Sequence, residues 1–281
     1  MRFCFDWRDC RVTVAILGGE PMLLAGRVST LLALPATVLV EAEAGAADLT
    51  ARETAHGAWR LEGALTCWHH RHFDDLLINL IAQVGQSFLQ RTDLLLLHSA
   101  ACSHNGEAVL FAGASRVGKS SLALAAWLVG HEFMADDVLA VDPRTRLTMT
   151  FPKALKPRLR ERAVPEPLVS LLPDAHRLVG EWSGEYRMLL GRGLPRMVAH
   201  ERELAFGRLY LVERAPSGPS RVAPLPREAA LRDLLAQVIT TRPSAPMEAV
   251  RLLRDWWAEG KVYRLWLGEN DLDRAVELML P

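Results

Sequence analysis

The sequence predicts an α/β fold with a small β-rich module ahead of it. Within residues 108–128, an apolar run leads into a glycine-bounded loop and then into a helical pattern. A second short apolar strand ends in two consecutive aspartates, Asp136 and Asp137. Strands that alternate with helices in this way are typical of α/β proteins. We expect the β-rich module to comprise residues 1–72 and the α/β domain to comprise residues 73–281.

Composition limits the classes of protein to which the chain can belong. Its 281 residues suffice for one large domain or two smaller ones, and half of them are hydrophobic, so a sizeable core is available. Lys plus Arg and Asp plus Glu both number 33, which argues against a general nucleic-acid binder. No apolar run is long enough to span a membrane, and no signal-peptide core opens the chain. The four cysteines form no Cys-x-x-Cys pair, so we expect free thiols in the cytoplasm.

Residues 1–65 are predicted to form mainly strands and turns. Phe3, Phe5 and Trp7 alternate with other residues, as in a half-buried strand. Residues 11–17 form a second candidate strand. The simplest role for such a module is to cover one face of the sheet, and a role in binding a substrate or a partner stays open.

A histidine-rich segment, Cys67–His72, raises the question of a metal site. Adjacent histidines in a strand point to opposite faces, so they cannot ligate one ion together. No further ligands complete a recognised zinc spacing. We therefore expect this segment to be structural.

The segment before the glycine-bounded loop contains a helix and a strand. Residues 74–90 have helical spacing of their apolar side chains, and residues 93–102 form a predicted buried strand that contains His98. A lone histidine in such a strand is either a hydrogen-bonded core residue or a member of a site. Both interpretations of His98 stay open at this point. Asn105-Gly106 then predicts a hairpin turn into the next strand.

The loop itself has the pattern Gly-x-x-x-x-Gly-Lys-Ser, which is that of a P-loop. Its residues are Gly113, Ala114, Ser115, Arg116, Val117, Gly118, Lys119 and Ser120. A P-loop requires a strand before it and a helix after it, and both are predicted here. Its backbone N–H groups bind phosphate at the N-terminus of a helix. We expect ATP to bind at Gly113–Ser121, with Lys119 on the phosphates and Ser120 on Mg²⁺.

Two aspartates follow the next predicted strand, at the edge of the sheet where ligands bind in α/β proteins. One carboxylate could accept a proton from an attacking hydroxyl, and the other could support Mg²⁺. Alternatively, Asp136 and Asp137 only organise the metal, as in many ATPases. The pair alone does not separate these two interpretations.

Three features together resemble the catalytic core of HPr kinase/phosphorylase and its relatives. That family has a histidine before the P-loop strand, then Gly-x-x-x-x-Gly-Lys-Ser, then a Gly-His-x-x-x-Ala-Asp-Asp segment. This chain has His98, the loop Gly113–Ser120, and the segment Gly130–Asp137. The resemblance covers residues 94–141 and implies a core like that of HPr kinase.

The resemblance also implies roles for the individual residues. Asp136 would be the general base, and Asp137 would support it or bind Mg²⁺ together with Ser120. Lys119 would bind phosphate, and His98 would lie close to the aspartates. Ser121 stands where the family usually has Glu, and no downstream Glu matches the family's metal ligand unambiguously. The kinase activity is therefore expected, and the reverse, phosphorylase, activity stays open.

The implied function is ATP-dependent phosphorylation of a hydroxyl, with serine on a protein or peptide as the expected acceptor. Relatives of the family also tailor ribosomally made peptides, including lasso-peptide precursors, so a precursor peptide is among the acceptors that the resemblance implies. No nucleic-acid or membrane partner is expected, and a homo-oligomer is left open. Two alternatives remain, namely a nucleotide-dependent switch or assembly ATPase and a non-catalytic nucleotide-binding module.

The rest of the chain carries weaker signals. Two prolines predict a loop over residues 151–160, in which Lys153, Lys156 and Arg158 could face phosphate or an acidic substrate. A solvated basic loop is the alternative. The elements expected after it are a strand at 209–212, helices at 228–239 and 246–259, a strand at 262–267 and a helix at 271–280.

Overall fold

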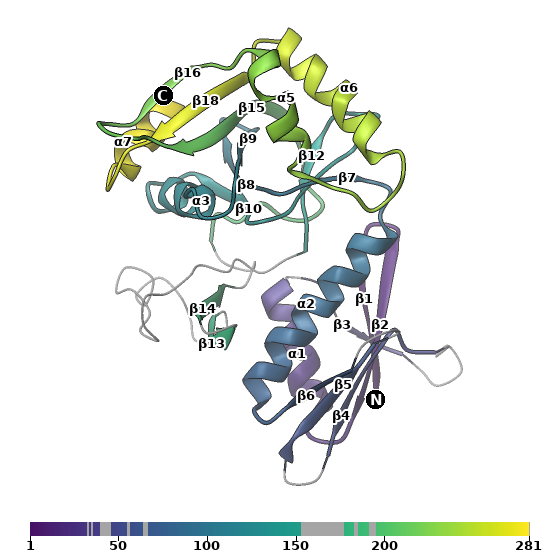
Figure 1. Ribbon diagram of the computed structural model, residues 1–281. Coiled ribbons are helices and arrows are strands. Elements are labelled where there is room, and N and C mark those ends of the chain that lie inside the picture. The colour runs from purple at the N-terminus through teal and green to yellow at the C-terminus, as the bar shows by residue number, and fades with distance from the viewer. Residues whose placement is uncertain are drawn as a thin grey trace. The chain divides into compact units, whose positions relative to one another are not determined.

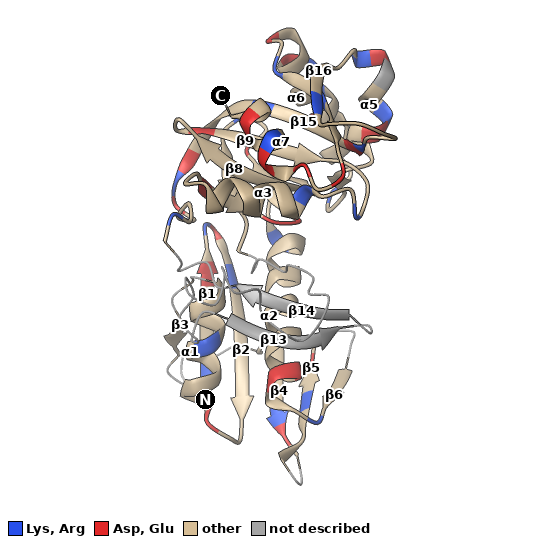
Figure 2. Cartoon of the chain, turned by 90° about the vertical axis from the view of Figure 1, so that its left-hand side faces the viewer, with Lys and Arg blue, Asp and Glu red and all other residues tan. Residues whose placement is uncertain are grey.

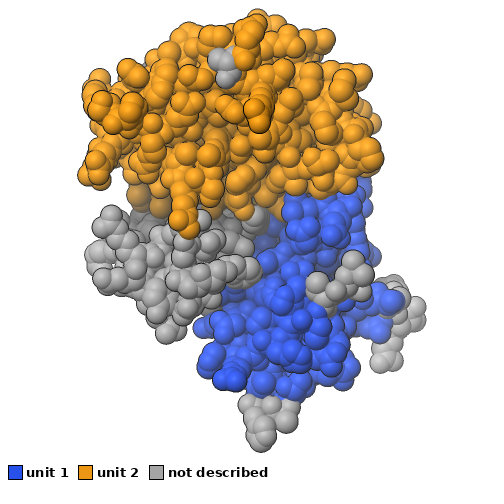
Figure 3. All heavy atoms as spheres, viewed as in Figure 1, with its two compact units in different colours: residues 1–92, 152–195 blue, residues 93–151, 196–281 orange. Residues whose placement is uncertain are grey.

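The chain divides into two compact units, which we describe separately (Figure 3). Unit 1 comprises Met1–Thr92 and Pro152–Pro195, and unit 2 comprises Asp93–Phe151 and Arg196–Pro281. The computed structural model describes residues 1–32, 34, 36–39, 46–54, 57–63, 67–152, 177–182, 185–190 and 195–280.

In its described residues, unit 1 has a six-stranded sheet, two helices and a separate two-stranded hairpin (Figure 1). The strand order of the sheet is β3-β1-β2-β4-β5-β6, and only the β2–β4 pair is parallel. Its elements are β1 (Arg2–Trp7), β2 (Cys10–Leu17), α1 (Pro21–Leu32), β3 (Ala36–Val38), β4 (Leu49–Glu53), β5 (Trp59–Glu62), β6 (Cys67–His70), α2 (Phe73–Arg91), β13 (Arg177–Trp182) and β14 (Glu185–Leu190).

Helix α1 corrects the expectation that residues 1–65 form only strands and turns. Pro21 is the first residue of the helix, where a missing N–H is tolerated. Leu24, Val28 and Leu31 are fully buried and follow helical spacing. The sequence signal was weak because the helix has no acidic residue in its first turn and no basic residue in its last. The alternating strand β1 is present as predicted.

Helix α2 belongs to unit 1, whereas we expected the boundary to fall after His72. The helix contacts β2, β4, β5 and β6, so its buried side packs on the six-stranded sheet. For example, the rings of Phe88 on α2 and Trp7 on β1 meet edge to face, with centroids 6.0 Å apart. Since this packing continues along the whole helix, the compact unit extends to Thr92.

Strand β6 shows the predicted alternation of its histidines. His70 contacts the Asn79 side chain on α2, with 3.2 Å between His70 Nε2 and Asn79 Nδ2. His69 lies on the exposed face, where its Nε2 is 3.9 Å from Cys67 Sγ. The two histidines therefore face different surroundings, as their adjacent positions in a strand require.

Unit 2 contains a ten-stranded sheet, with the order β10-β8-β9-β15-β12-β11-β7-β17 and with β18 and β16 added at β15. Its elements are β7 (Leu95–Leu97), β8 (Ser99–His104), β9 (Glu107–Ala112), α3 (Lys119–Leu128), β10 (Glu132–Ala135), β11 (Leu139–Val141), β12 (Thr148–Thr150), β15 (Glu203–Arg214), β16 (Arg221–Pro224), α5 (Arg227–Leu235), β17 (Val238–Ile239), α6 (Ala245–Ala258), β18 (Val262–Leu267) and α7 (Leu272–Met279). The strand predicted at 262–267 is confirmed at both ends, and the late helices are confirmed with shifted ends.

The segment expected as one strand over residues 93–102 forms two strands instead. β7 pairs with β11 and β17, whereas β8 pairs with β9 and β10. His98 lies at the break between them, and its backbone N–H donates to the Gln237 carbonyl oxygen at 2.6 Å. At this break the chain passes from one set of partner strands to another. His98 therefore belongs to neither strand.

Three parallel strands, β9, β15 and β18, bring their carboxyl ends to one edge of the sheet. Ala112, the last residue of β9, is level with Leu211 on β15, and Arg214 at the end of β15 is level with Leu267 at the end of β18. The loop after β9 therefore emerges beside the ends of two other strands. Acidic and basic residues are interspersed in each unit (Figure 2), in line with the zero net charge.

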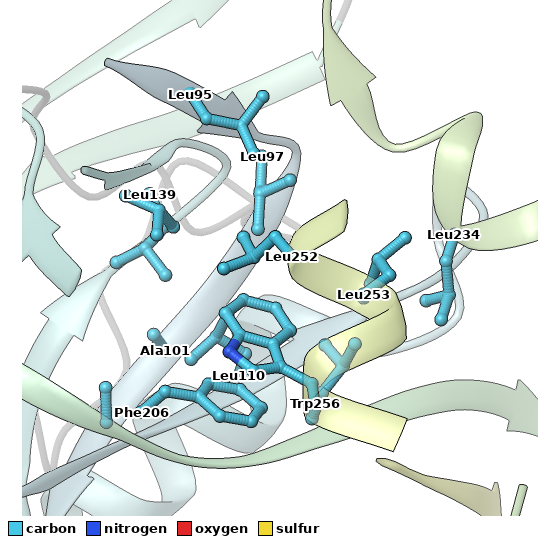
Figure 4. Packing of buried hydrophobic residues seen from close by; sticks show 14 of the residues in the cluster. Leu95, Leu97, Ala101, Leu110, Leu139, Phe206, Leu234, Leu252, Leu253 and Trp256 are labelled. Carbon is cyan, nitrogen blue, oxygen red and sulfur yellow. The ribbon is translucent and has the colours of Figure 1, made fainter. Parts of the chain in front are cut away.

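The core of unit 2 lies between this sheet and α6 (Figure 4). Trp256 on α6 stacks on Phe206 of β15, with ring centroids 3.6 Å apart and planes 8° from parallel. Leu252 and Leu253 of the same helix are also buried in this cluster. This packing fixes β15, whose far end reaches the loop edge. In the described part of the chain, no helix combines the length and the apolar character needed to cross a membrane.

Candidate active site

The loop between β9 and α3 has the backbone that its glycines predict. Gly113 and Gly118 have φ of 139° and 115°, which side-chain-bearing residues rarely adopt. A Cβ at Gly113 would lie 2.5 Å from the Val212 carbonyl oxygen, and one at Gly118 would lie 2.7 Å from Leu267 Cδ2. The loop thus lies tightly against the ends of β15 and β18. Both the dihedral angles and the contacts require glycine at these positions.

Gly113→Ala is expected to lower the free energy of unfolding by about 1–3 kcal/mol, since it forces a strained φ and overlaps with the Val212 carbonyl. It should also weaken ATP binding, because the loop must shift. Urea denaturation and calorimetric titration with ATP measure the two effects. Gly26→Ala is the control, because Gly26 lies inside α1 with open space around it and the change should stabilise by about 0.5–1 kcal/mol. Native stability and affinity in Gly113→Ala would contradict the tight fit of the loop.

Lys119 is the first residue of α3, and only 7% of its surface is exposed. Its Nζ donates to the carbonyl oxygens of Gly113 and Ala114, at 2.7 and 2.9 Å. Burial lowers the pKa of Lys119, while the charges of Asp137 and Asp136 act in the opposite direction. The ammonium is therefore held against the loop and close to two carboxylates. In this position it can attract an anion that binds at the loop.

Asp136 meets the next residue of the helix, Ser120. β10 and β9 run in the same direction, because both are antiparallel to β8, so the end of β10 lies at the loop edge. The Ser120 hydroxyl donates to Asp136 Oδ1 at 2.5 Å. Asp136 is buried, with 5% of its surface exposed. A hydroxyl and a carboxylate thus converge directly beside the loop.

Asp137 faces a different partner. Its Oδ1 is 2.8 Å from His98 Nε2, and the two side chains are 46% and 38% exposed, respectively. The backbone of Asp137 is left-handed, with φ of 73°, which is uncommon outside glycine although aspartate tolerates it better than most residues. This turn directs two consecutive carboxylates to separate partners. Asp137 and His98 are thus partly exposed to solvent, whereas Asp136 is buried.

The oxygen donors at Ser120 and Asp136 fit a Mg²⁺ ion. Mg²⁺ prefers hard oxygen ligands and is usually held by one or two carboxylates together with phosphate oxygens of the substrate. In the described residues, no three His, Cys, Asp or Glu side chains gather into a metal site, so the phosphates and water would have to complete the coordination. We expected Ser120 and Asp137 as the metal ligands; the structure places the Asp136 carboxylate beside the Ser120 hydroxyl and the Asp137 carboxylate beside His98.

The structure brings the predicted site residues together to different extents. Lys119, Ser120, Asp136, Asp137 and His98 surround the start of α3 through the contacts above. The loop residues Ala114, Ser115 and Arg116 are exposed, Val117 is partly buried, and Ser121 is exposed on the first turn of the helix. The basic residues proposed for substrate binding, Lys153, Lys156 and Arg158, lie outside the described residues.

One charged residue near the loop was not singled out from the sequence. An added Cβ at Gly118 would lie 3.8 Å from Nη2 of Arg214, at the end of β15. Arg214 is distant from the loop in sequence and belongs to no motif. The pairing of β9 with β15 is what brings Arg214 next to the loop.

No family model matches the chain. No curated protein matches it either. Among solved structures, one similar chain is the HPr(Ser) kinase/phosphatase from Coxiella burnetii, with 14% identity, a TM-score of 0.28, and coverage of 58% of this chain and 91% of that chain. The function is therefore inferred from the residues of this chain.

Proposed function

We propose that unit 2 is an ATP-dependent kinase that transfers the γ-phosphoryl group to a serine hydroxyl of a protein or peptide, a ribosomally made precursor peptide being one candidate. The observation that carries the proposal is that two consecutive aspartates contact different residues. Asp136 is buried against the Ser120 hydroxyl, and Asp137 is partly exposed and contacts His98. A carboxylate beside the Ser120 hydroxyl is sufficient to bind a metal ion. Proton transfer from an acceptor requires a second carboxylate that the acceptor can reach, and Asp137 meets this requirement.

The phosphate side of the site consists of the loop, Lys119, Ser120 and Asp136. The loop N–H groups and the Lys119 ammonium bind the phosphates of ATP. Ser120 and Asp136 would hold Mg²⁺, which would supply positive charge against the phosphates. Asp136 accepts a hydrogen bond from Ser120 and so orients the serine oxygen.

The acceptor side consists of Asp137 and His98. The Asp137 carboxylate takes the proton of the serine hydroxyl while the serine oxygen bonds to the γ-phosphorus. The bond from the γ-phosphorus to its bridging oxygen breaks, and ADP leaves. His98 orients the carboxylate through its 2.8 Å contact. This assignment reverses the roles expected from the sequence, where Asp136 was the base, because Asp136 is buried and already engaged by Ser120.

His98→Ala is expected to lower the rate of phosphoryl transfer by about 10- to 100-fold, the size of one hydrogen bond to a charged group. The Kd for ATP should stay nearly unchanged, because His98 contacts Asp137, which lies outside the loop Gly113–Ser120. His104→Ala is the matched control, since His104 lies at the other end of β8. Stopped-flow transfer rates and calorimetric titration with ATP separate the two quantities. Lower stability with unchanged activity per folded molecule would instead make His98 a core residue.

A further inference from the structure

We propose that Arg214 is a second cationic ligand of the nucleotide's polyphosphate, acting across the loop from Lys119. This inference rests on the proposed function, because it assigns a further binding residue to the same site. Arg214 is the last residue of β15, and its side chain is exposed. Its Nη2 lies beside Gly118, the residue that directly precedes Lys119.

The position of Arg214 is fixed by the sheet. Its Cα partner in β18 is Leu267, and the N–H of Ala215 donates to the Leu267 carbonyl oxygen at 2.9 Å, so pairing continues past the end of the strand. Leu267 in turn packs against Gly118. The same pair of strand ends therefore supports both the loop and the arginine.

The charge pattern of β15 separates Arg214 from its neighbour. Successive side chains on a strand point to opposite faces. Glu213 is paired with Arg264 of β18, with 3.3 Å between Oε1 and Nε. Arg214 is thus directed away from this carboxylate and toward the loop, which leaves its charge available for an anion.

An arginine at this place suits phosphate chemically. The guanidinium group is always charged and binds two phosphate oxygens through its planar fork. In a loop of this pattern, the backbone N–H groups bind the phosphates nearest the helix N-terminus. Since Gly118 is part of that cradle, the Arg214 guanidinium reaches the same phosphates, which ATP and ADP share.

The experiment compares ATP and ADP binding to the native protein, Arg214→Gln, Arg214→Lys, Arg221→Gln and Lys119→Ala by calorimetric titration at several salt concentrations. We expect Arg214→Gln to weaken both nucleotides by about 10-fold or more. Affinity should also depend less on salt, because one charge contact is lost. The affinity of Arg214→Lys for both nucleotides should lie between that of the native protein and that of Arg214→Gln. Arg221 stacks on Trp266 with its guanidinium 4.5 Å from the ring centroid, so Arg221→Gln should bind as the native protein does.

Three outcomes would overturn this inference, and they show whether the proposed nucleotide site fails with it. If Arg214→Gln binds both nucleotides with native affinity and native salt dependence while Lys119→Ala loses binding, Arg214 is not a phosphate ligand and the loop still is. If Lys119→Ala also binds both nucleotides normally, the loop is not the nucleotide site, and the inference falls with it. A lower affinity of Arg214→Gln with an unchanged salt dependence would mean that Arg214 only supports the loop, which also overturns the proposal.

Discussion

Lys119→Ala is expected to lower ATP turnover by about 10²- to 10³-fold, the effect of removing one preorganised charge partner of a reacting group. It should also weaken ATP binding. The Lys119 ammonium is buried against the loop carbonyls, and the two aspartates next to it oppose the effect of burial on its pKa. No other lysine in the described residues starts a helix at this edge of the sheet.

The measurement is the steady-state rate of ADP formation, together with the Kd for ATP. Lys261→Ala is the control, because Lys261 donates to the Phe206 carbonyl oxygen and is paired with Glu259 elsewhere in unit 2. Unfolding curves show whether each variant is folded. Native turnover in folded Lys119→Ala would remove the P-loop assignment.

Asp137→Asn and Asp136→Asn are expected to impair phosphoryl transfer in different ways. Asp137→Asn keeps the shape of the side chain but removes the proton acceptor, so phosphoryl transfer should fall by about 10²- to 10⁴-fold while ATP still binds. Asp136→Asn can still accept the hydrogen bond from Ser120, but it loses the charge that attracts a cation. This variant should therefore need more Mg²⁺ and recover much of its rate when Mg²⁺ is supplied in excess.

Single-turnover transfer from labelled ATP, with a Mg²⁺ titration for each variant, distinguishes these effects. Each aspartate serves as the control for the other, because the two substitutions are chemically identical and adjacent. Exchanged phenotypes would restore Asp136 as the base, which is the assignment expected from the sequence. Full activity in both variants would exclude the kinase mechanism.

The sequence predicted the parts of the site that are local in the chain. The glycines at 113 and 118, the strand before them and the helix after them occur within one short segment, so spacing alone suffices to place them. The two aspartates were also located at the end of a strand. The separate partners of Asp136 and Asp137 were not predictable, because they depend on one left-handed backbone angle at Asp137.

The remaining features depend on contacts between distant segments. Arg214 meets the loop only because β15 pairs with β9 and β18, and strand pairing cannot be derived from the motif. Likewise, α2 belongs to unit 1 because of its packing on the six-stranded sheet, although its helical pattern was clear. Helix α1 was missed because an apolar run without charged ends gives little indication of its periodicity.

The most direct test of the central claim is mass spectrometry of serine-containing peptides after incubation with ATP, Mg²⁺ and either the native protein or Asp137→Asn. We predict that the native protein adds a phosphate group to serine and releases ADP in equal amount, and that Asp137→Asn loses this product while still binding ATP. Release of inorganic phosphate in amounts equal to ADP, with no modified peptide and no difference between the two proteins, would contradict phosphoryl transfer. That result would identify a nucleotide-dependent switch or assembly ATPase instead.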